Sequence, residues 1–183
     1  MLYAFLVLLS LSDGFHPTCP SRCSCDSLQS VQCYRLTEVP SALPSTTKKL
    51  YISHSKIPHL QMSSFTRMLA LEDFILLASG TESVENDTFK TLSTLKTLEL
   101  WKNKLRQVPR ILPASLEVLK LNDNSIYVLH GSDFEGLKKL KILELKNNLI
   151  SSLSPTTLSS LVSLQSLVLD DNSIDSVAGP LAL

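Results

Sequence analysis

A short pattern of leucine and asparagine recurs along this chain and constrains its fold more than any other feature of the sequence. The clearest copy runs from Leu116 to Ile126 and reads L-x-x-L-x-L-x-x-N-x-I. Such repeats decide a fold because each unit adopts the same local structure and packs only against its neighbours. Four clear copies begin at Leu95, Leu116, Leu140 and Leu164, and two weaker copies, beginning at Thr47 and Leu71, have Ser55 and Ser79 in place of the asparagine.

The copies form units of two lengths. Successive starts are equally spaced, except that the step from Leu95 to Leu116 is shorter than the others. The same short step back from Thr47 leads to Asp26, which places Val31 and Leu36 in the repeat register. The units therefore follow the order short, long, long, and this order repeats along the chain. The short units have an apolar residue at the same position in each repetition of this order, namely Leu36, Leu105 and Ile174.

Short and long units differ in their second halves. Short units contain a Val-Pro-x-x-Leu-Pro segment, at 39–44 and 108–113, which proline keeps out of a helix. Long units have a bulky apolar nineteenth residue, which is Phe65, Phe89, Phe134 or Leu158.

The pattern is the leucine-rich-repeat signature and predicts an α/β-type solenoid curved like a horseshoe. The fourth and sixth residues of each unit are apolar and two apart, so both point inward from a strand. Strands of successive units are expected to pair in parallel along the concave face, with extended or short helical segments on the convex face. The asparagine turns the chain, and its amide can satisfy backbone groups buried in that turn.

The chain is expected to divide into three parts. Residues 1–14 contain an apolar run, Leu2 to Leu11, that is too short to span a bilayer but has the length of a signal-peptide core. A buried N-terminal helix is the alternative interpretation of this run. Residues 15–46 are expected to form a cysteine-rich cap that includes a short first repeat, and residues 47–183 the leucine-rich repeats. No later stretch has the length and apolarity of a membrane helix.

All four cysteines lie close together, at Cys19, Cys23, Cys25 and Cys33. Behind a signal peptide they favour disulfides, and four cysteines allow three pairings. A zinc site is the competing interpretation, but it would favour C-x2-C pairs, which this spacing lacks. A reactive thiol is disfavoured because no spare cysteine remains. The cluster is therefore expected to close the N-terminal end of the repeat core.

From Cys19 onward the chain resembles the small leucine-rich proteoglycans of the extracellular matrix. The resemblance rests on Cys19-Pro-Ser-Arg-Cys-Ser-Cys25, the following Val31-Gln-Cys33, the Val-Pro and Leu-Pro pairs, and the short-long-long order. It implies disulfides Cys19–Cys25 and Cys23–Cys33. It also implies a secreted matrix protein whose partners include collagen or growth factors of the transforming-growth-factor-β type.

Solenoids bind ligands on the concave face, so the outward side chains of the strands are the candidate binding residues. They include an apolar patch around Trp101, a residue type enriched at binding hot spots, and a run of alternating charges. The alternative interpretation is that Trp101 folds over its neighbours and that the charges form a solvated ladder. The candidates are Tyr51, Ile75, Leu77, Glu99, Trp101, Lys120, Asn122 and Lys146.

Other sites are expected to be few. Asn86 begins the sequon Asn86-Asp87-Thr88 and is expected to carry an N-linked glycan in a secreted chain. Asp170 and Asp171 offer too few oxygens for calcium, and Ser79-Gly80 lies at a repeat turn, which disfavours a glycosaminoglycan chain there. We expect no metal and no cofactor.

Charge and motifs disfavour other functions. Seventeen basic and seventeen acidic side chains give zero net charge, which removes the electrostatic case for nucleic acid. An enzyme is disfavoured because the chain has no phosphate-binding glycine loop and its histidines have no metal-ligand spacing. These are His16, His54, His59 and His130.

The leading hypothesis is therefore a secreted protein-binding module, and a receptor ectodomain is the alternative. Because the chain ends inside a seventh unit, we also expect it to self-associate through an open strand, or to have no independent function.

Overall fold

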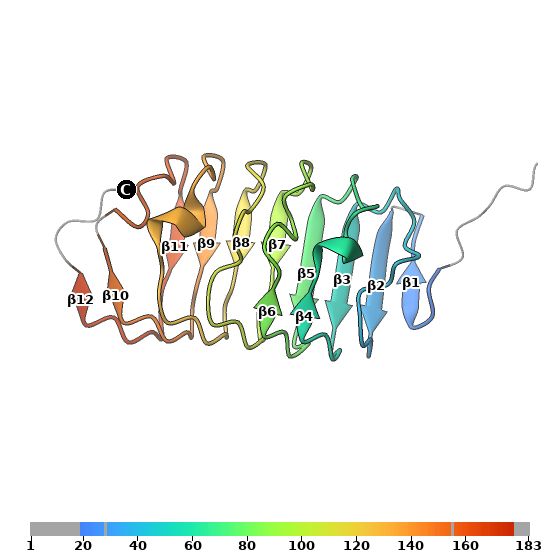
Figure 1. Ribbon diagram of the computed structural model, residues 1–183, viewed down its shortest axis with the longest axis horizontal. Coiled ribbons are helices and arrows are strands. Elements are labelled where there is room, and N and C mark those ends of the chain that lie inside the picture. Colours follow the sequence, from blue (N-terminus) through green and yellow to red (C-terminus); the bar gives the residue numbers. More distant parts are fainter. Residues whose placement is uncertain (1–18, 28, 155, 178–183) are drawn as a thin grey trace, which may run out of the picture.

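The computed structural model describes residues 19–27, 29–154 and 156–177, which form an elongated solenoid built on one large sheet (Figure 1). The expected signal peptide lies outside these residues. The strands of the sheet follow the order β1-β2-β3-β5-β7-β8-β9-β11. All neighbours pair in parallel except β1 and β2, which are antiparallel. The strands are β1 (Cys23–Cys25), β2 (Ser30–Tyr34), β3 (Lys49–Ser53), β5 (Asp73–Leu77), β7 (Thr97–Glu99), β8 (Val118–Lys120), β9 (Ile142–Glu144) and β11 (Ser166–Val168).

The pairing of the strands joins equivalent positions of successive units. The fourth residues lie opposite one another along the sheet, in the order Leu50, Phe74, Leu98, Leu119, Leu143 and Leu167. Side chains alternate between the two faces of a strand, so this register places the fourth and sixth residues on one side. From Leu50 to Leu143 the row is completely buried.

The first unit departs from the expected register by two positions. A start at Asp26 would place Val31 opposite Ile52, but β2 pairs Val31 with Leu50 and Cys33 with Ile52. Leu36 still lies at the turn, because its N–H donates to Ser55 Oγ and its carbonyl accepts from Lys56 N. The disulfide to Cys23 and the antiparallel pairing with β1 fix the strand of this unit, so its register does not follow the repeat.

The back of the solenoid consists of extended segments and single helical turns. Two small parallel sheets lie there, one of β4 (His59–Leu60) and β6 (Ser83–Val84), the other of β10 (Ser152–Leu153) and β12 (Ser176–Val177). The helical turns are 3-10 helices, η1 (Met62–Ser64) and η2 (Gly131–Phe134), and the described residues contain no α-helix. The expected leucine-rich-repeat solenoid, with parallel strands on one face and extended or short helical segments on the other, is confirmed, and the short helical segments are 3-10 turns.

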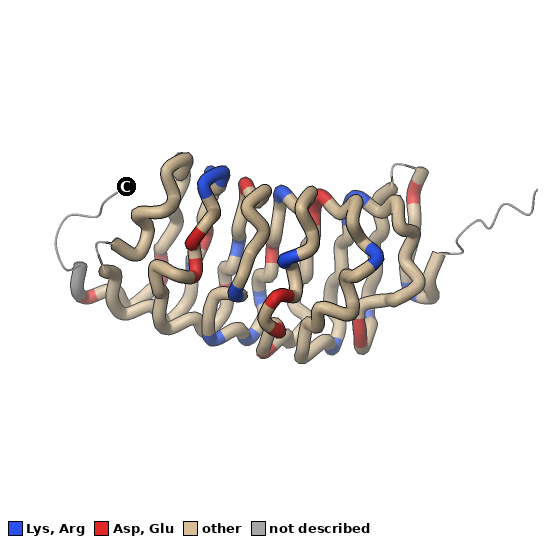
Figure 2. Tube along the Cα trace, turned by 45° about the horizontal axis from the view of Figure 1, so that its top comes forward, with Lys and Arg blue, Asp and Glu red and all other residues tan. Residues whose placement is uncertain are grey.

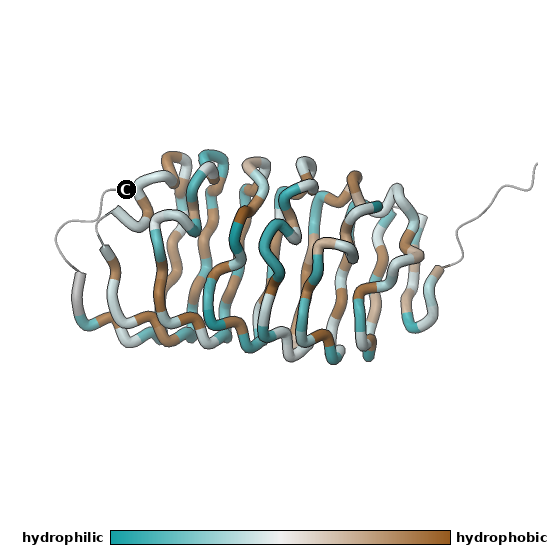
Figure 3. The backbone as a smooth tube through the Cα atoms, viewed as in Figure 1, coloured by the Kyte–Doolittle hydropathy of each residue, from teal (hydrophilic) through white to brown (hydrophobic). Residues whose placement is uncertain are grey.

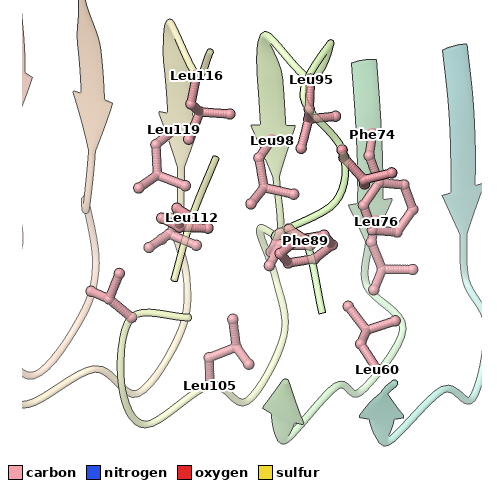
Figure 4. Packing of buried hydrophobic residues seen from close by; sticks show 14 of the residues in the cluster. Leu60, Phe74, Leu76, Phe89, Leu95, Leu98, Leu105, Leu112, Leu116 and Leu119 are labelled. Carbon is pink, nitrogen blue, oxygen red and sulfur yellow. The ribbon is translucent and has the colours of Figure 1, made fainter. Parts of the chain in front are cut away.

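The core lies between the main sheet and the back, where leucines from successive units lie one behind another (Figure 4). Apolar positions recur from coil to coil along the backbone (Figure 3). Near β5 the stack is aromatic. Phe65, Phe74 and Phe89 are completely buried, and their ring centroids lie 5.0, 5.3 and 6.1 Å apart. Phe65 meets Phe74 and Phe89 edge to face, and such contacts stabilise a core beyond the burial of apolar area.

Asparagines close the turn after each later strand. Asn103 Oδ1 accepts hydrogen bonds from Ser79 N and Thr81 N of the preceding unit, and its Nδ2 donates to Leu76 O and Trp101 O. Asn124, Asn148 and Asn172 bond in the same way, except that each Oδ1 accepts from one N–H of the preceding unit instead of two. In the two units that lack the asparagine, Ser55 and Ser79 donate only to the carbonyl two residues before them.

Two disulfides close the N-terminal end. Cys19 is bonded to Cys25 and Cys23 to Cys33, which is the pairing that the family resemblance implies. Cys33 lies in the core, and β1 covers the edge of β2 that would otherwise be open. The Cys23–Cys33 disulfide therefore joins β2, the strand of the first repeat, covalently to β1, which covers its edge.

Candidate functional site

The outward side chains of the main sheet form ordered rows. The fifth residues of the units lie opposite one another in the order Tyr51, Ile75, Glu99, Lys120, Glu144 and Val168. Backbone hydrogen bonds order the seventh residues in the same way, because each eighth N–H donates to the seventh carbonyl of the next unit. The carbonyls that accept are those of Leu77, Trp101, Asn122, Lys146 and Asp170. All eight candidate residues thus lie along one outward face, either on strands of the main sheet or directly after them.

The N-terminal half of this face is apolar. Tyr51, Ile75, Leu77 and Trp101 are half-buried side chains on adjacent strands or directly after them. The structure adds Tyr34 of β2, which lies opposite Ser53 of β3 and is 55% exposed. We call Tyr34, Tyr51, Ile75, Leu77 and Trp101 the apolar patch.

Sequence reasoning missed Tyr34 because of the register of the first unit. A unit starting at Asp26 places residue 34 ninth, in the turn, whereas β2 continues through Tyr34. The antiparallel pairing of β1 with β2 brings Cys23 opposite Cys33, which fixes the strand. In the sequence, only the pairing of Cys23 with Cys33 could have indicated that Tyr34 lies on the sheet face.

Trp101 contributes an aromatic ring to the patch, and in the described part of the chain its indole N–H lacks a hydrogen-bond acceptor. Its ring is half-buried, and Lys102 Nζ lies 5.6 Å from the ring centroid, a cation–π distance. Its indole Nε1 is buried and has no hydrogen-bond acceptor among the described residues. A buried donor without an acceptor costs about 1–3 kcal/mol, so an oxygen brought to this position would be stabilised.

The C-terminal half of the face is charged. Lys120 Nζ lies 3.6 Å from Glu99 Oε1 and 3.6 Å from Glu144 Oε1, and the three side chains are 31%, 19% and 25% exposed. One ammonium group thus faces two carboxylates, which leaves negative charge in the centre of the sheet. The pairs themselves add only about 0–1 kcal/mol each to stability, because all three groups contact water.

Asn122 and Lys146 are already engaged within the chain. Asn122 Nδ2 donates to Glu144 Oε2 at 2.7 Å, and its Oδ1 accepts from Lys146 N at 2.8 Å. Lys146 Nζ lies 3.4 Å from Asp171 Oδ2. Asn122 therefore fixes the carboxylate of Glu144 and has little capacity left for a partner.

A second line of charges follows the edge at which the chain enters the strands, where the second residues of the units alternate in sign (Figure 2). Glu72 contacts Lys48 at 3.4 Å and Lys96 at 2.7 Å, and Lys141 contacts Glu117 at 2.6 Å. Hydrogen bonds from Lys96 and Lys141 lower the pKa of Glu72 and Glu117, and the bond to Glu72 raises the pKa of Lys96. All these groups are in contact with solvent.

The remaining candidate positions are placed as follows. Asn86 is exposed, while Thr88 of its sequon is buried and donates to Glu85 O at 2.6 Å. Ser79 is completely buried, and its hydroxyl donates to Leu77 O. In the part of the chain that the structure describes, no three His, Cys, Asp or Glu side chains form a group that could hold a metal ion. The same residues contain no helix long and apolar enough to cross a membrane.

The amino-acid sequence is similar to those of known leucine-rich-repeat proteins. A family model described as Leucine rich repeat matches residues 114–174. The chain is 77% identical over 137 residues to nephrocan of Mus musculus, an alignment that covers 75% of this chain and 27% of nephrocan. It is 33% identical over 106 residues to Toll-like receptor 7 of Mus musculus, covering 50% of this chain and 10% of the receptor. With fibromodulin of Oryctolagus cuniculus it shares 31% identity over 105 residues, which cover 57% of this chain and 71% of the fibromodulin sequence.

Proposed function

Because this chain belongs to the small leucine-rich proteoglycan family of leucine-rich-repeat proteins, we propose that it is secreted and binds extracellular proteins through the outward face of its main sheet. The observation that carries the proposal is the apolar patch. Outward sheet positions in contact with water are usually polar, yet β2, β3, β5 and the end of β7 bring three aromatic and two aliphatic side chains together there. Exposed patches of this kind mark interaction sites.

The face offers a partner two kinds of contact. The apolar patch supplies aromatic anchors, which carry most of the binding energy in protein interfaces. The charged half supplies specificity, because the two carboxylates beside Lys120 favour a partner with positive charge at that point. Collagen and a growth factor of the transforming-growth-factor-β type are the partners that the family resemblance implies, and we propose them as the first to test.

The experiment compares two tyrosines of equal exposure. Tyr34 is 55% exposed on the sheet face, and Tyr127 is 57% exposed outside it, beside Val84 and Pro109. The secreted chain is immobilised and tested by surface plasmon resonance against fibrillar collagen and against the growth factor. Tyr34→Ala and Trp101→Ala should each weaken binding about tenfold or more, as expected for hot-spot side chains, and Tyr127→Ala should leave it unchanged.

Two results would contradict the proposal. One is binding that Tyr34→Ala and Trp101→Ala leave intact, and the other is an equal loss in Tyr127→Ala. The urea midpoint of each variant shows whether a loss of binding results from unfolding.

A receptor ectodomain is the second candidate, and the similarity to Toll-like receptor 7 favours it. The two candidates differ in where the protein is found. Expression of the complete natural transcript in mammalian cells, with separate measurement of medium and cell surface, distinguishes them. We expect the protein in the medium, with a shift on peptide N-glycosidase treatment that Asn86→Gln reduces by one glycan.

A further inference from the structure

The densest lysine cluster of the chain lies in the turn before β9. Lys138, Lys139 and Lys141 are exposed, whereas Leu137 and Leu140 between them are completely buried. Lys138 N donates to Gly136 O at 2.9 Å and Leu140 N to Leu137 O at 3.1 Å, so hydrogen bonds hold the turn. The buried leucines thus fix a backbone from which three ammonium groups reach solvent.

Two of these lysines have no acidic partner at salt-bridge distance, although Lys139 is close enough to Glu117 to act on its charge. Lys141 Nζ contacts Glu117 at 2.6 Å. Across the described ranges, Lys138 and Lys139 have no carboxylate oxygen within 4.0 Å, although Lys48, Lys49, Lys90, Lys96, Lys104, Lys120 and Lys146 each have one. Adjacent unpaired cations repel each other and attract multivalent anions.

A groove with a volume of about 270 Å³ lies beside this turn. Lys139 and Lys96 line it, together with Ser93, Thr94, Ser115, Glu72 and Glu117. The two carboxylates do not cancel the cluster, because Glu72 is occupied by Lys48 and Lys96 and Glu117 by Lys141. Four lysines, counting Lys138 and Lys141, surround two carboxylates, so the groove and the turn are positive. Figure 2 shows this turn as the blue loop above β9.

We propose that this turn and groove bind a linear sulfated polysaccharide of the extracellular matrix. The lysines come from different units, with Lys96 before β7 and Lys141 before β9, so they lie ~10 Å apart along the sheet. A small anion reaches one or two of them, whereas a polymer with regularly spaced sulfates contacts all four. Ammonium groups are point charges without bidentate geometry, which suits such a polymer better than a single shaped ligand.

Other polyanions fit this site less well. Binding of single-stranded nucleic acid uses aromatic side chains on which bases stack, and no aromatic residue lines the groove. Binding to an anionic membrane surface uses an amphipathic helix or a lipid anchor, and the described residues contain no α-helix. The extracellular polysaccharide is the ligand to which the proposed secretion of the chain would expose the site.

Heparin affinity chromatography tests the proposal. Wild type should be retained on heparin at physiological ionic strength, about 0.15 M. Lys138→Glu/Lys139→Glu should pass through, with a Kd for heparin weaker by about tenfold or more, because polyanion binding falls steeply with the number of ionic contacts. The matched control, Lys56→Glu/Arg106→Glu, changes the charge equally at two exposed cations that follow strands instead of preceding them, and it should be retained.

Three outcomes would overturn the proposal: wild type that flows through, an equal loss in both double variants, and equal retention on single-stranded DNA or on phosphatidylserine vesicles. Lys138→Gln/Lys139→Gln repeats the test without like-charge contacts if the glutamate variant does not fold. Tyr34→Ala should keep full heparin retention, so failure here is separable from failure of the proposed sheet-face function.

Discussion

Replacing Phe89 by leucine should destabilise the solenoid more than the same replacement of Phe134. Both residues are the nineteenth of a long unit, and both are completely buried. The ring of Phe89 lies 5.3 Å from that of Phe65 and 6.1 Å from that of Phe74, whereas the described part of the chain gives Phe134 no aromatic neighbour. Leu158 occupies the corresponding position of another unit, so the backbone there accepts leucine.

The magnitude follows from the two ring contacts. Exchange of one large apolar side chain for another of similar volume costs less than about 1.5 kcal/mol, and this part is common to both sites. An aromatic pair contributes about 0.5–1.5 kcal/mol beyond its buried area, so losing two pairs adds about 1–3 kcal/mol at Phe89 alone. With a urea dependence of about 2 kcal/mol per molar, the midpoint of Phe89→Leu should lie about 0.5–1.5 M below that of Phe134→Leu.

Urea denaturation of both variants, followed by far-ultraviolet circular dichroism and by Trp101 fluorescence, measures this difference. Equal midpoints would refute the ring contribution, and a lower midpoint for Phe134→Leu would show that the surrounding packing dominates. A double-mutant cycle with Phe65→Leu isolates one pair and should give a coupling of about 0.5–1.5 kcal/mol.

Three further substitutions test other parts of the structure. Asn148→Ala removes an amide that donates to Leu121 O and Leu145 O and accepts from Ile126 N, and should lower the free energy of unfolding by about 3 kcal/mol in the same urea assay. Replacing Cys23 and Cys33 by serine removes the disulfide that fixes β2 and should cost about 2–4 kcal/mol, seen as a lower melting temperature. The hydrogen bond from Lys141 lowers the pKa of Glu117 in the folded chain. The contribution of this ion pair to stability is therefore present above pH 4.5 and is lost as the pH falls through the lowered folded-state pKa of Glu117. In acid titrations of stability, Glu117→Gln should remove that part of the loss, and wild type in high salt should show less of it.

How far the sequence predicts this structure depends on whether a residue obeys the repeat. Equivalent positions recur with the two spacings of the short and long units, so the core row, the outward rows and the asparagine turns can be assigned from spacing alone. The cap does not obey the repeat, because a disulfide and an antiparallel strand set the register of β2. The repeat register therefore assigns Tyr34 to a turn, although it lies on the sheet face.

The charged side chains show a second limit of sequence reasoning. The alternation of Glu99, Lys120 and Glu144 is visible in the sequence, but the engagement of Asn122 with Glu144 depends on side-chain geometry between units. Likewise, a net charge of zero conceals the turn at Lys138 and Lys139. Whether a lysine is paired depends on which carboxylate the neighbouring unit places beside it, and among the described residues no carboxylate oxygen lies within 4.0 Å of Lys138 or Lys139.

The two proposed surfaces are independent for a structural reason. Each unit of a solenoid contacts only its neighbours, so stability is nearly a sum of local terms. The apolar patch lies on the outward face of β2, β3, β5 and the end of β7, while the lysine turn and its groove lie at the edge where the chain enters β5 to β9, so the two sites share no residue. A substitution at Tyr34 should therefore change protein binding and leave heparin binding intact, and a substitution at Lys138 and Lys139 should do the reverse. A variant that loses both has lost the fold between them, so measuring both ligands on both variants separates recognition from stability without any further assay.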